Sequence, residues 1–138
     1  DIPLQSEEFI AQFQMMLTSR NDLIIEAGTS WFEGQRLYLP DGATYNMQCQ
    51  YASIGWAVGA ALGYQLAIGS DRRVIALIGD GAFQMTGYEI STMLRYNCPV
   101  IMFILNNRGY TIEKELHNGP YNNIKNWDYA GLVKAYNA

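Results

Sequence analysis

Short apolar runs alternate along the chain with longer stretches in which apolar residues recur at helical spacing. The apolar runs lie at residues 23–25, 74–79 and 100–105. Helical spacing is found at residues 7–18, 54–68, 86–96 and after Asp128. Nearly continuous apolar runs are typical of parallel strands buried on both faces. The alternation therefore predicts an α/β fold with a doubly wound parallel sheet.

The segments between these elements contain turn-forming residues. Ser6 is expected to cap the first helix, and Asp128 the last one. Residues 31–46 are expected to form an irregular connection, with a turn near Pro40. Residues 106–127 are dense in Asn, Gly and Tyr and predict a long, ordered loop, a kind of segment that is commonly functional.

The helix expected at 54–68 is unusually rich in glycine and alanine. Helical propensity disfavours so many glycines. Two explanations remain open. The small residues allow close packing against a sheet or another helix, or they allow the backbone of the first turn to approach a ligand.

Composition restricts the possible function classes. The chain has 138 residues, 49% of them hydrophobic, and a formal net charge of −4. This size suits one domain, and the acidic balance without a basic stripe argues against a nucleic-acid partner. The apolar runs are too short or too interrupted to span a membrane. Cys49 and Cys98 are isolated, so we expect two free thiols and a cytoplasmic location.

Polar residues follow two of the predicted strands. Gly79-Asp80-Gly81 ends one run and Asn106-Asn107 ends the next, with Asp80 and Asn107 27 positions apart. That spacing accommodates one strand–helix–strand crossover, which brings both polar tips to the same edge of a parallel sheet. A carboxylate and an amide oxygen suit a divalent cation that holds a phosphate. Each motif is weak alone, and the pair at this spacing is strong.

The same segments resemble the pyruvate decarboxylase family of thiamine-diphosphate-dependent enzymes. The resemblance covers nearly the whole chain and is carried by Glu26–Phe32, Gln50–Trp56, Ile78–Gln84, Asn106–Glu113 and His117–Tyr129. It implies the thiamine-diphosphate-binding fold, with thiamine diphosphate and Mg²⁺ as cofactors. The metal ligands it implies are the side chains of Asp80 and Asn107 and the carbonyl of Gly109.

The resemblance also assigns residues to the organic cofactor. Thr29, Gly81 and Ala82 would contact the diphosphate, and Ile54 would be the apolar wedge that holds the cofactor bent. Ala52 stands where the family usually has glycine, in a role that needs only a backbone carbonyl. The remaining cofactor-binding residues that it implies are Ser53, Tyr110, Thr111 and Ile112.

Glu113 is the candidate catalytic residue. By resemblance it lies over the reactive carbon of the cofactor, handles the substrate carboxylate and donates a proton. A dry, apolar pocket would suit that proton donor, because burial disfavours an ionised carboxyl. His117, the sole histidine, is expected to be a loop residue bonded to nearby backbone. Trp31, Trp56 and Trp127 are expected to be packing residues.

The implied activity is the decarboxylation of a 2-keto acid, with pyruvate converted to acetaldehyde and carbon dioxide. Indolepyruvate, phenylpyruvate and branched-chain keto acids are alternative substrates. Enzymes of this family have three domains, so residues 1–138 are expected to be the thiamine diphosphate- and magnesium-binding domain of a larger protein, inactive alone. The missing pyrimidine-binding domain would come from a neighbouring subunit of a homodimer or homotetramer.

Two other function classes remain as alternatives. A non-catalytic assembly module with the same fold would use the small-residue helix and the aromatic residues as an interface, but it would not need a metal clamp. A generic dinucleotide-binding domain would carry a G-x-G-x-x-G motif after an early strand, and the sequence has none there.

Overall fold

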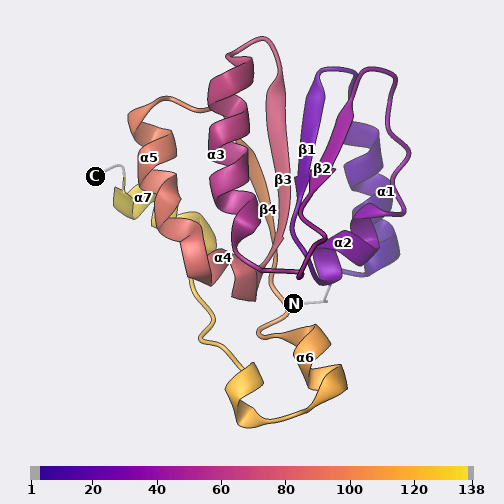
Figure 1. Ribbon diagram of the computed structural model, residues 1–138, viewed down its shortest axis with the longest axis vertical. Coiled ribbons are helices and arrows are strands. Elements are labelled where there is room, and N and C mark those ends of the chain that lie inside the picture. Colours follow the sequence, from indigo (N-terminus) through magenta and orange to yellow (C-terminus); the bar gives the residue numbers. More distant parts are fainter. Residues whose placement is uncertain (1–3, 137–138) are drawn as a thin grey trace.

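The computed structural model describes residues 4–136 and shows a parallel β-sheet between two layers of helices (Figure 1). The strands, in the spatial order β2-β1-β3-β4, are β2 (Thr44–Met47), β1 (Asn21–Ile25), β3 (Arg73–Gly79) and β4 (Ile101–Leu105). Every neighbouring pair in this sheet is parallel. The α/β, doubly wound architecture expected from the sequence is therefore confirmed.

Helices cover both faces of this sheet. The α-helices are α1 (Ser6–Met16), α2 (Thr29–Gly34), α3 (Trp56–Ile68), α4 (Asp80–Thr86), α5 (Ile90–Arg95), α6 (Thr111–Leu116) and α7 (Tyr129–Tyr136). Helices α1 and α2 lie on one face, and α3, α4, α5 and α7 lie on the other (Figure 1). Two 3-10 helices, η1 (Gly87–Glu89) and η2 (Pro120–Asn122), complete the elements described.

Alternate residues of β1 and β3 supply the two cores. Ile24 and Ala76 belong to the core beneath α3, whereas Leu23 and Leu77 belong to the core beneath α1. All four are at most 1% exposed. Burial of each large side chain contributes about 1.5–3 kcal/mol, so the two central strands hold both layers of helices together.

Several local expectations were wrong. Helix α1 begins at Ser6 with Gln5 as its N-cap residue, and the Ser6 hydroxyl instead accepts a hydrogen bond from Arg36 at 3.2 Å. The connection expected at 31–46 contains the end of α2 and the edge strand β2, which is too short and polar to give a strand signal. Asp128 does cap α7, since its Oδ1 accepts the Gly131 N–H at 2.9 Å.

The small residues of α3 divide between two environments. Ala57 and Ala61 are fully buried against the sheet, which confirms close packing for the alanines. Gly59 and Gly63 are exposed, and a Cβ at either position would meet nothing within 4 Å. Packing within the described residues therefore explains the alanines but not these two glycines.

The strand order creates a switch point between β1 and β3. From β1 the chain passes through α2 to β2 on one side, and from β2 it passes through α3 to β3 on the other side of β1. Connections that leave in opposite directions open a crevice at the carboxyl ends of the two strands, where ligands of α/β proteins commonly bind. The fold thus places a crevice beside Asp80, the first residue after β3.

No helix within residues 4–136 is both long enough and apolar enough to cross a lipid bilayer.

Candidate functional site

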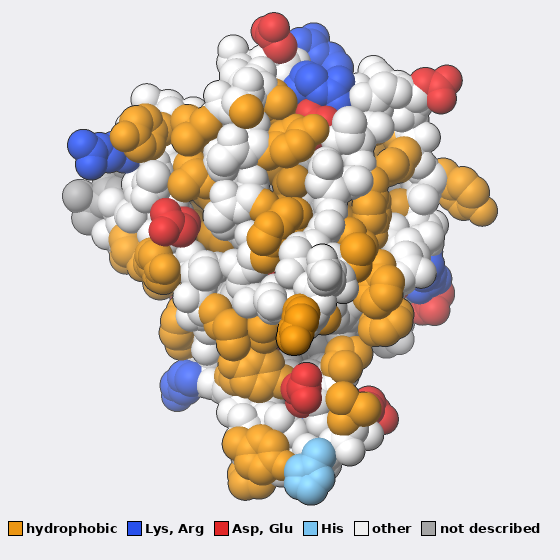
Figure 2. All heavy atoms as spheres, viewed as in Figure 1, with side chains coloured by type: hydrophobic (Ala, Val, Ile, Leu, Met, Phe, Trp, Pro, Cys, Tyr) orange, Lys and Arg blue, Asp and Glu red, His pale blue; other side chains and the backbone are white. Residues whose placement is uncertain are grey.

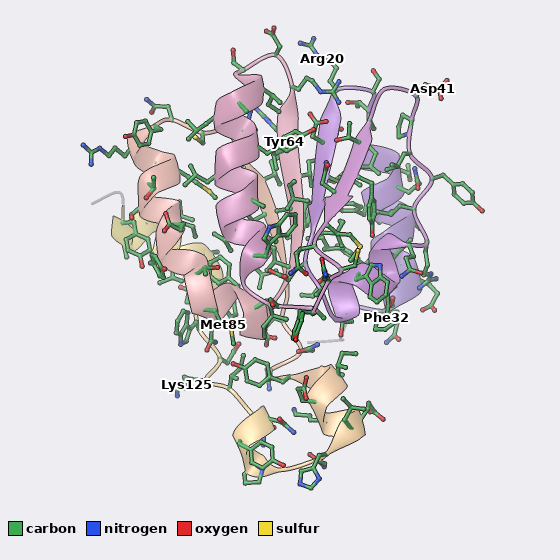
Figure 3. The ribbon with its side chains drawn as sticks, in the orientation of Figure 1. Arg20, Phe32, Asp41, Tyr64, Met85 and Lys125 are labelled. Carbon is green, nitrogen blue, oxygen red and sulfur yellow. The ribbon has the colours of Figure 1, made fainter. Side chains whose placement is uncertain are left out.

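A cavity of about 200 Å³ occupies the crevice at the switch point. Its walls come from the segments that follow β1, β3 and β4, together with the loop before α3. Figure 3 shows Phe32 and Met85 at this end of the sheet and Arg20 and Asp41 at the opposite end. Most of the predicted site residues line this cavity: Thr29, Ala52, Ile54, Asp80, Gly81, Ala82, Asn107, Gly109, Tyr110, Thr111, Ile112 and Glu113.

Asp80 is the buried charge of the site, with 1% of its surface exposed. Its Oδ1 accepts the Gly81 N–H at 2.8 Å, and its Oδ2 accepts the Arg108 N–H at 2.6 Å. Burial raises the pKa of Asp80, although these N–H groups act to lower it. A bound cation would remove the desolvation cost of the carboxylate, so this environment suits a metal ligand.

Asn107 and Gly109 bring two further polar atoms to Asp80. One side-chain atom of Asn107 lies 2.8 Å from the Gly109 carbonyl oxygen and 3.0 Å from Asp80 Oδ1, and the other lies 2.7 Å from Thr111 Oγ1. With the amide nitrogen in the first position, it donates to both oxygens. With the amide oxygen there, it lies within 3.0 Å of two other oxygens, a contact that a bound cation would stabilise.

The spacing of these atoms fits Mg²⁺. Ligands about 2.1 Å from an octahedral ion lie about 3 Å apart along each edge. Within residues 4–136 no cluster of three His, Cys, Asp or Glu side chains is suited to a metal. A cation in this crevice would therefore depend on one carboxylate, one amide and one backbone carbonyl, a set of hard oxygen ligands typical of Mg²⁺.

The loop after β4 packs closely on the first turn of α4. A Cβ on Gly81 would lie 2.5 Å from the ring of Tyr110, so glycine is needed at position 81. This contact holds the loop that carries Gly109 and Glu113 against the end of β3. The Gly81 N–H, expected to face a diphosphate, is already donated to Asp80.

Glu113 lies in the first turn of α6 and lines the cavity. The segment expected at 106–127 as a loop contains this helix and η2, which are short and surrounded by Asn and Gly. Glu113 is exposed in this chain, so the expectation of a dry, apolar pocket is not met by the described residues. The cavity that Glu113 lines is partly open to solvent.

Other residues differ from expectation. Ser53 is exposed and does not line the cavity. Trp31 packs on the core beneath α1 and also lines the cavity. Further lining residues that were not predicted are Ala27, Gly28, Phe32 and Gly79. Most of these residues belong to the segment Glu26–Phe32, whose resemblance to the family could have identified them as site residues. His117 lies away from the cavity, and its ring stacks on Tyr121 with centroids 6.2 Å apart.

A second cavity, of about 380 Å³, lies between β4, α5 and α7. Its lining is almost entirely apolar and includes Phe83, Met93 and Val133. It lacks the converging polar groups that orient a reacting ligand. The smaller cavity at the switch point is therefore the better candidate for a functional site.

Residues 26–138 match the family described as thiamine pyrophosphate enzyme, C-terminal TPP binding domain. The chain belongs to this family. The matched residues include every segment that contributes to the switch-point cavity, so the TPP-binding domain accounts for the site as well as for the fold.

Curated relatives of this TPP-binding domain are named pyruvate decarboxylases, which confirms the resemblance seen in the sequence. Pyruvate decarboxylase 2 of Pisum sativum is 54% identical over 133 residues, which make up 96% of this chain and 33% of the relative. Pyruvate decarboxylase of Neurospora crassa is 49% identical over 136 residues, which make up 99% of this chain and 24% of the relative. The chain thus spans about a quarter to a third of the length of these relatives.

A solved structure from Mycobacterium smegmatis, titled as belonging to the thiamin diphosphate-dependent enzymes, has the same fold. The TM-score is 0.78 at 24% sequence identity, over 97% of this chain and 25% of the other. At this identity the likeness supports the architecture alone.

Proposed function

We propose that this chain is the cofactor-binding domain of a thiamine-diphosphate-dependent decarboxylase that converts pyruvate to acetaldehyde and carbon dioxide. One observation carries the proposal: a side-chain atom of Asn107 lies 2.8 Å from the Gly109 carbonyl oxygen and 3.0 Å from Asp80 Oδ1, in a cavity that Glu113 also lines. The names of the relatives favour pyruvate over larger keto acids.

Asp80, Asn107 and the Gly109 carbonyl would hold Mg²⁺, which would in turn bind the diphosphate. The hard oxygen donors and the raised pKa of Asp80 support this assignment. Thr29 and Ala82 line the same cavity and would contact the diphosphate. Thiamine diphosphate, when bound, supplies the electron sink that decarboxylation requires.

The other lining residues would orient the reaction. Ile54 and the backbone of Ala52 enter the cavity from the loop before α3 and would shape the cofactor. Glu113, on α6, lines the same cavity and would move a proton at the reacting carbon through its carboxyl group. Proton transfer by such a positioned group is typically worth about 10²- to 10⁴-fold in rate.

The site needs more protein than this chain supplies. A cavity of about 200 Å³ is smaller than the roughly 300–1,000 Å³ of most ligand pockets, and Glu113 is exposed at its edge. Both features support completion of the site by a pyrimidine-binding domain from a neighbouring subunit, in a homodimer or homotetramer. A cytoplasmic location stays a prediction from the two isolated cysteines.

Calorimetry on the full-length protein tests the proposal. We expect the wild type to bind thiamine diphosphate in the presence of Mg²⁺, and Asp80→Asn to lower that affinity at least about tenfold, because a neutral amide is a weaker cation ligand than a carboxylate. The matched control is Asp22→Asn, which changes a buried carboxyl near the start of β1, at the end of the sheet remote from Asp80. Equal affinity of wild type and Asp80→Asn would overturn the site.

A further inference from the structure

Glu26 is a buried carboxylate that follows β1 and does not line the cavity. Its Oε1 accepts the Ala27 N–H at 3.0 Å. Its Oε2 accepts the N–H groups of Gly55 at 3.0 Å and Ala57 at 2.9 Å. Gly55 is the N-cap residue of α3, so Glu26 caps a 13-residue helix from a different element.

The segment that this cap holds has an unfavourable backbone. Tyr51 and Ala52 have φ angles of 66° and 47°, and Gly55 has a φ of 94°. Residues other than glycine rarely adopt a positive φ, so surrounding contacts must hold this backbone conformation. Between these residues Ile54 enters the cavity, which makes the shape of the segment part of the shape of the site.

Thr86, at the end of α4, holds the same segment from the other side. Its Oγ1 donates to the Gly55 carbonyl oxygen at 2.7 Å. A Cβ on Gly55 would lie 3.1 Å from the Cβ of Met85, so α4 also limits the space available. Both backbone polar groups of Gly55 are thus fixed by side chains from two different elements.

We propose that Glu26 and Thr86 are positioning residues that hold the segment Tyr51–Gly55 so that Ala52 and Ile54 line the cofactor cavity. They act through this segment and do not line the cavity themselves. The identity of the ligand rests on the proposed function, whereas the mechanical link between Glu26, Thr86 and the segment does not.

The chemistry of the cap supports a role beyond stability. Burial raises the pKa of Glu26 in spite of the three N–H donors, so an ionised carboxylate is less favourable there than in water. The far end of α3 is held by a neutral side chain: Gln65 donates to the carbonyls of Gly69 and Arg72 and accepts the Val74 N–H. The carboxyl group of Glu26 presents two oxygens to its three N–H donors, whereas the amide of a glutamine would present only one.

The experiment uses the full-length protein and five variants. Glu26→Gln removes one acceptor, and Thr86→Val one donor, of the hydrogen bonds that hold the segment Tyr51–Gly55 and the start of α3. Thr86→Ser keeps the hydroxyl. Gln65→Met removes the hydrogen bonds at the other end of α3. The fifth, Glu26→Asp, shortens the side chain by one methylene and withdraws the carboxylate from α3. Thiamine diphosphate affinity is measured by calorimetry with Mg²⁺, and hydrogen exchange of residues 51–57 is measured without cofactor.

Loss of one hydrogen bond corresponds to about a tenfold loss of affinity, which we expect for Glu26→Gln, Glu26→Asp and Thr86→Val. Exchange at residues 51–57 should become faster in the same three variants. Thr86→Ser should restore both readouts, and Gln65→Met should lower the melting temperature while leaving affinity within about twofold of the wild type.

The outcomes separate this inference from the proposed function. A wild type that binds no thiamine diphosphate overturns the proposed function, and the exchange data alone then decide whether Glu26 and Thr86 hold the segment. A wild type that binds, with Glu26→Gln and Thr86→Val binding equally well, overturns the inference. An equal loss of thiamine diphosphate affinity in Gln65→Met also overturns the inference, since general destabilisation of the protein would then explain the effect. If Glu26→Gln does not fold, the comparison of Thr86→Val with Thr86→Ser decides.

Discussion

Two carboxylates, Asp22 and Glu26, lie near the two ends of β1 and have opposite pKa shifts. Asp22 is buried, but hydrogen bonds from Arg72 and Thr44 outweigh the burial and lower its pKa. Arg72 Nε and Nη2 donate to its two oxygens at 2.7 and 2.8 Å. The hydrogen bonds to Glu26 come from backbone N–H groups rather than from a cation, and burial raises its pKa. Asp22 therefore favours the folded state when ionised, and Glu26 when protonated.

The first prediction concerns acid stability. Because the pKa of Asp22 is lowered by folding, its contribution is present above an unfolded-state value of about 4 and is lost as the pH falls through the folded value. We expect the melting temperature of the full-length protein to decrease as the pH is lowered below about 4. Asp22→Asn should have a lower melting temperature at neutral pH and a smaller change on acidification. An unchanged pH dependence in this variant would contradict the role of the Asp22–Arg72 pair.

The second prediction concerns Glu113. Glu113→Gln should lower turnover of pyruvate by about 10²- to 10⁴-fold, because the amide cannot exchange a proton with the substrate. Thiamine diphosphate affinity should stay within about twofold, since the metal ligands are untouched. The measurements are steady-state kinetics and calorimetry on the full-length protein.

Glu115→Gln is the matched control for this change. It makes the same substitution in the same helix, at an exposed residue that does not line the cavity. Equal loss of turnover in both variants would show that α6 as a whole, rather than the Glu113 carboxyl, supports the reaction.

At the scale of elements, the site depends on a lobe formed by residues 110–126, which contains α6 and η2 and extends beyond the end of the sheet (Figure 1). Its base is closed by the Tyr110 N–H, which donates to the Asn122 carbonyl at 2.9 Å, and by an antiparallel bridge between Gly109 and Asn123. Gln84 Nε2 donates to the Lys125 carbonyl at 2.6 Å and ties the lobe to α4. These bonds fix Gly109 and Glu113 relative to β3.

The third prediction concerns Asn122, the buried residue at the base of this lobe. It is 3% exposed, and its Nδ2 donates to the His117 carbonyl at 2.9 Å. Asn122→Ala should remove this hydrogen bond at a cost of about 1 kcal/mol, because that carbonyl keeps only the longer contact with the Tyr121 hydroxyl at 3.4 Å. Hydrogen exchange should become faster within residues 110–123, with little change in β1 and β3. Asn118→Ala, an exposed change in the same lobe, is the control and should leave exchange unaltered.

On the scale of the whole molecule, large apolar side chains are exposed at the end of the molecule that holds the cavity. Phe32, Tyr51, Met85 and Leu116 are each at least 47% exposed at this end of the sheet or on the lobe. On the face drawn in Figure 2, hydrophobic side chains extend from the helical layer onto the lobe, with most charged side chains toward the edges of the view. A surface of this kind suits contact with further protein.

The fourth prediction follows from this incomplete cavity. The purified 138-residue chain, given pyruvate, thiamine diphosphate and Mg²⁺, should release no measurable acetaldehyde, because the described residues leave Glu113 exposed and one side of the cavity open. A coupled alcohol dehydrogenase assay measures the product. Turnover by this chain alone would contradict the need for a second domain.

The accuracy of the sequence predictions depended on how each element is stabilised. The runs that became β1, β3 and β4 are apolar because helices cover both faces of the sheet, so they carry a strong signal. β2 is an edge strand with half-buried residues, and α2 and α6 have six residues each. Elements this short depend on tertiary contacts rather than on periodicity, which explains why the sequence did not reveal them.

One part of the site could be predicted from the sequence and another part could not. Asp80 and Asn107 follow apolar runs at a spacing that fits one crossover, so their meeting was predictable, and the 3.0 Å between their side chains confirms that geometry. The role of Glu26 was not predictable, because its partners Gly55 and Ala57 lie about thirty residues away and have no side-chain polarity of their own. Backbone donors leave no signal in the amino-acid sequence.

By itself, the order of apolar and polar residues determined a parallel sheet whose strand ends bring an acid and an amide together. The three-dimensional structure decided how the loop before α3 is held, how open the cavity is and how exposed Glu113 remains. The physical reason is that hydrophobic burial follows side-chain pattern, which is written in the sequence. Capping, backbone strain and the closing of a cavity depend on contacts between backbone groups and distant segments, which only the folded chain brings together.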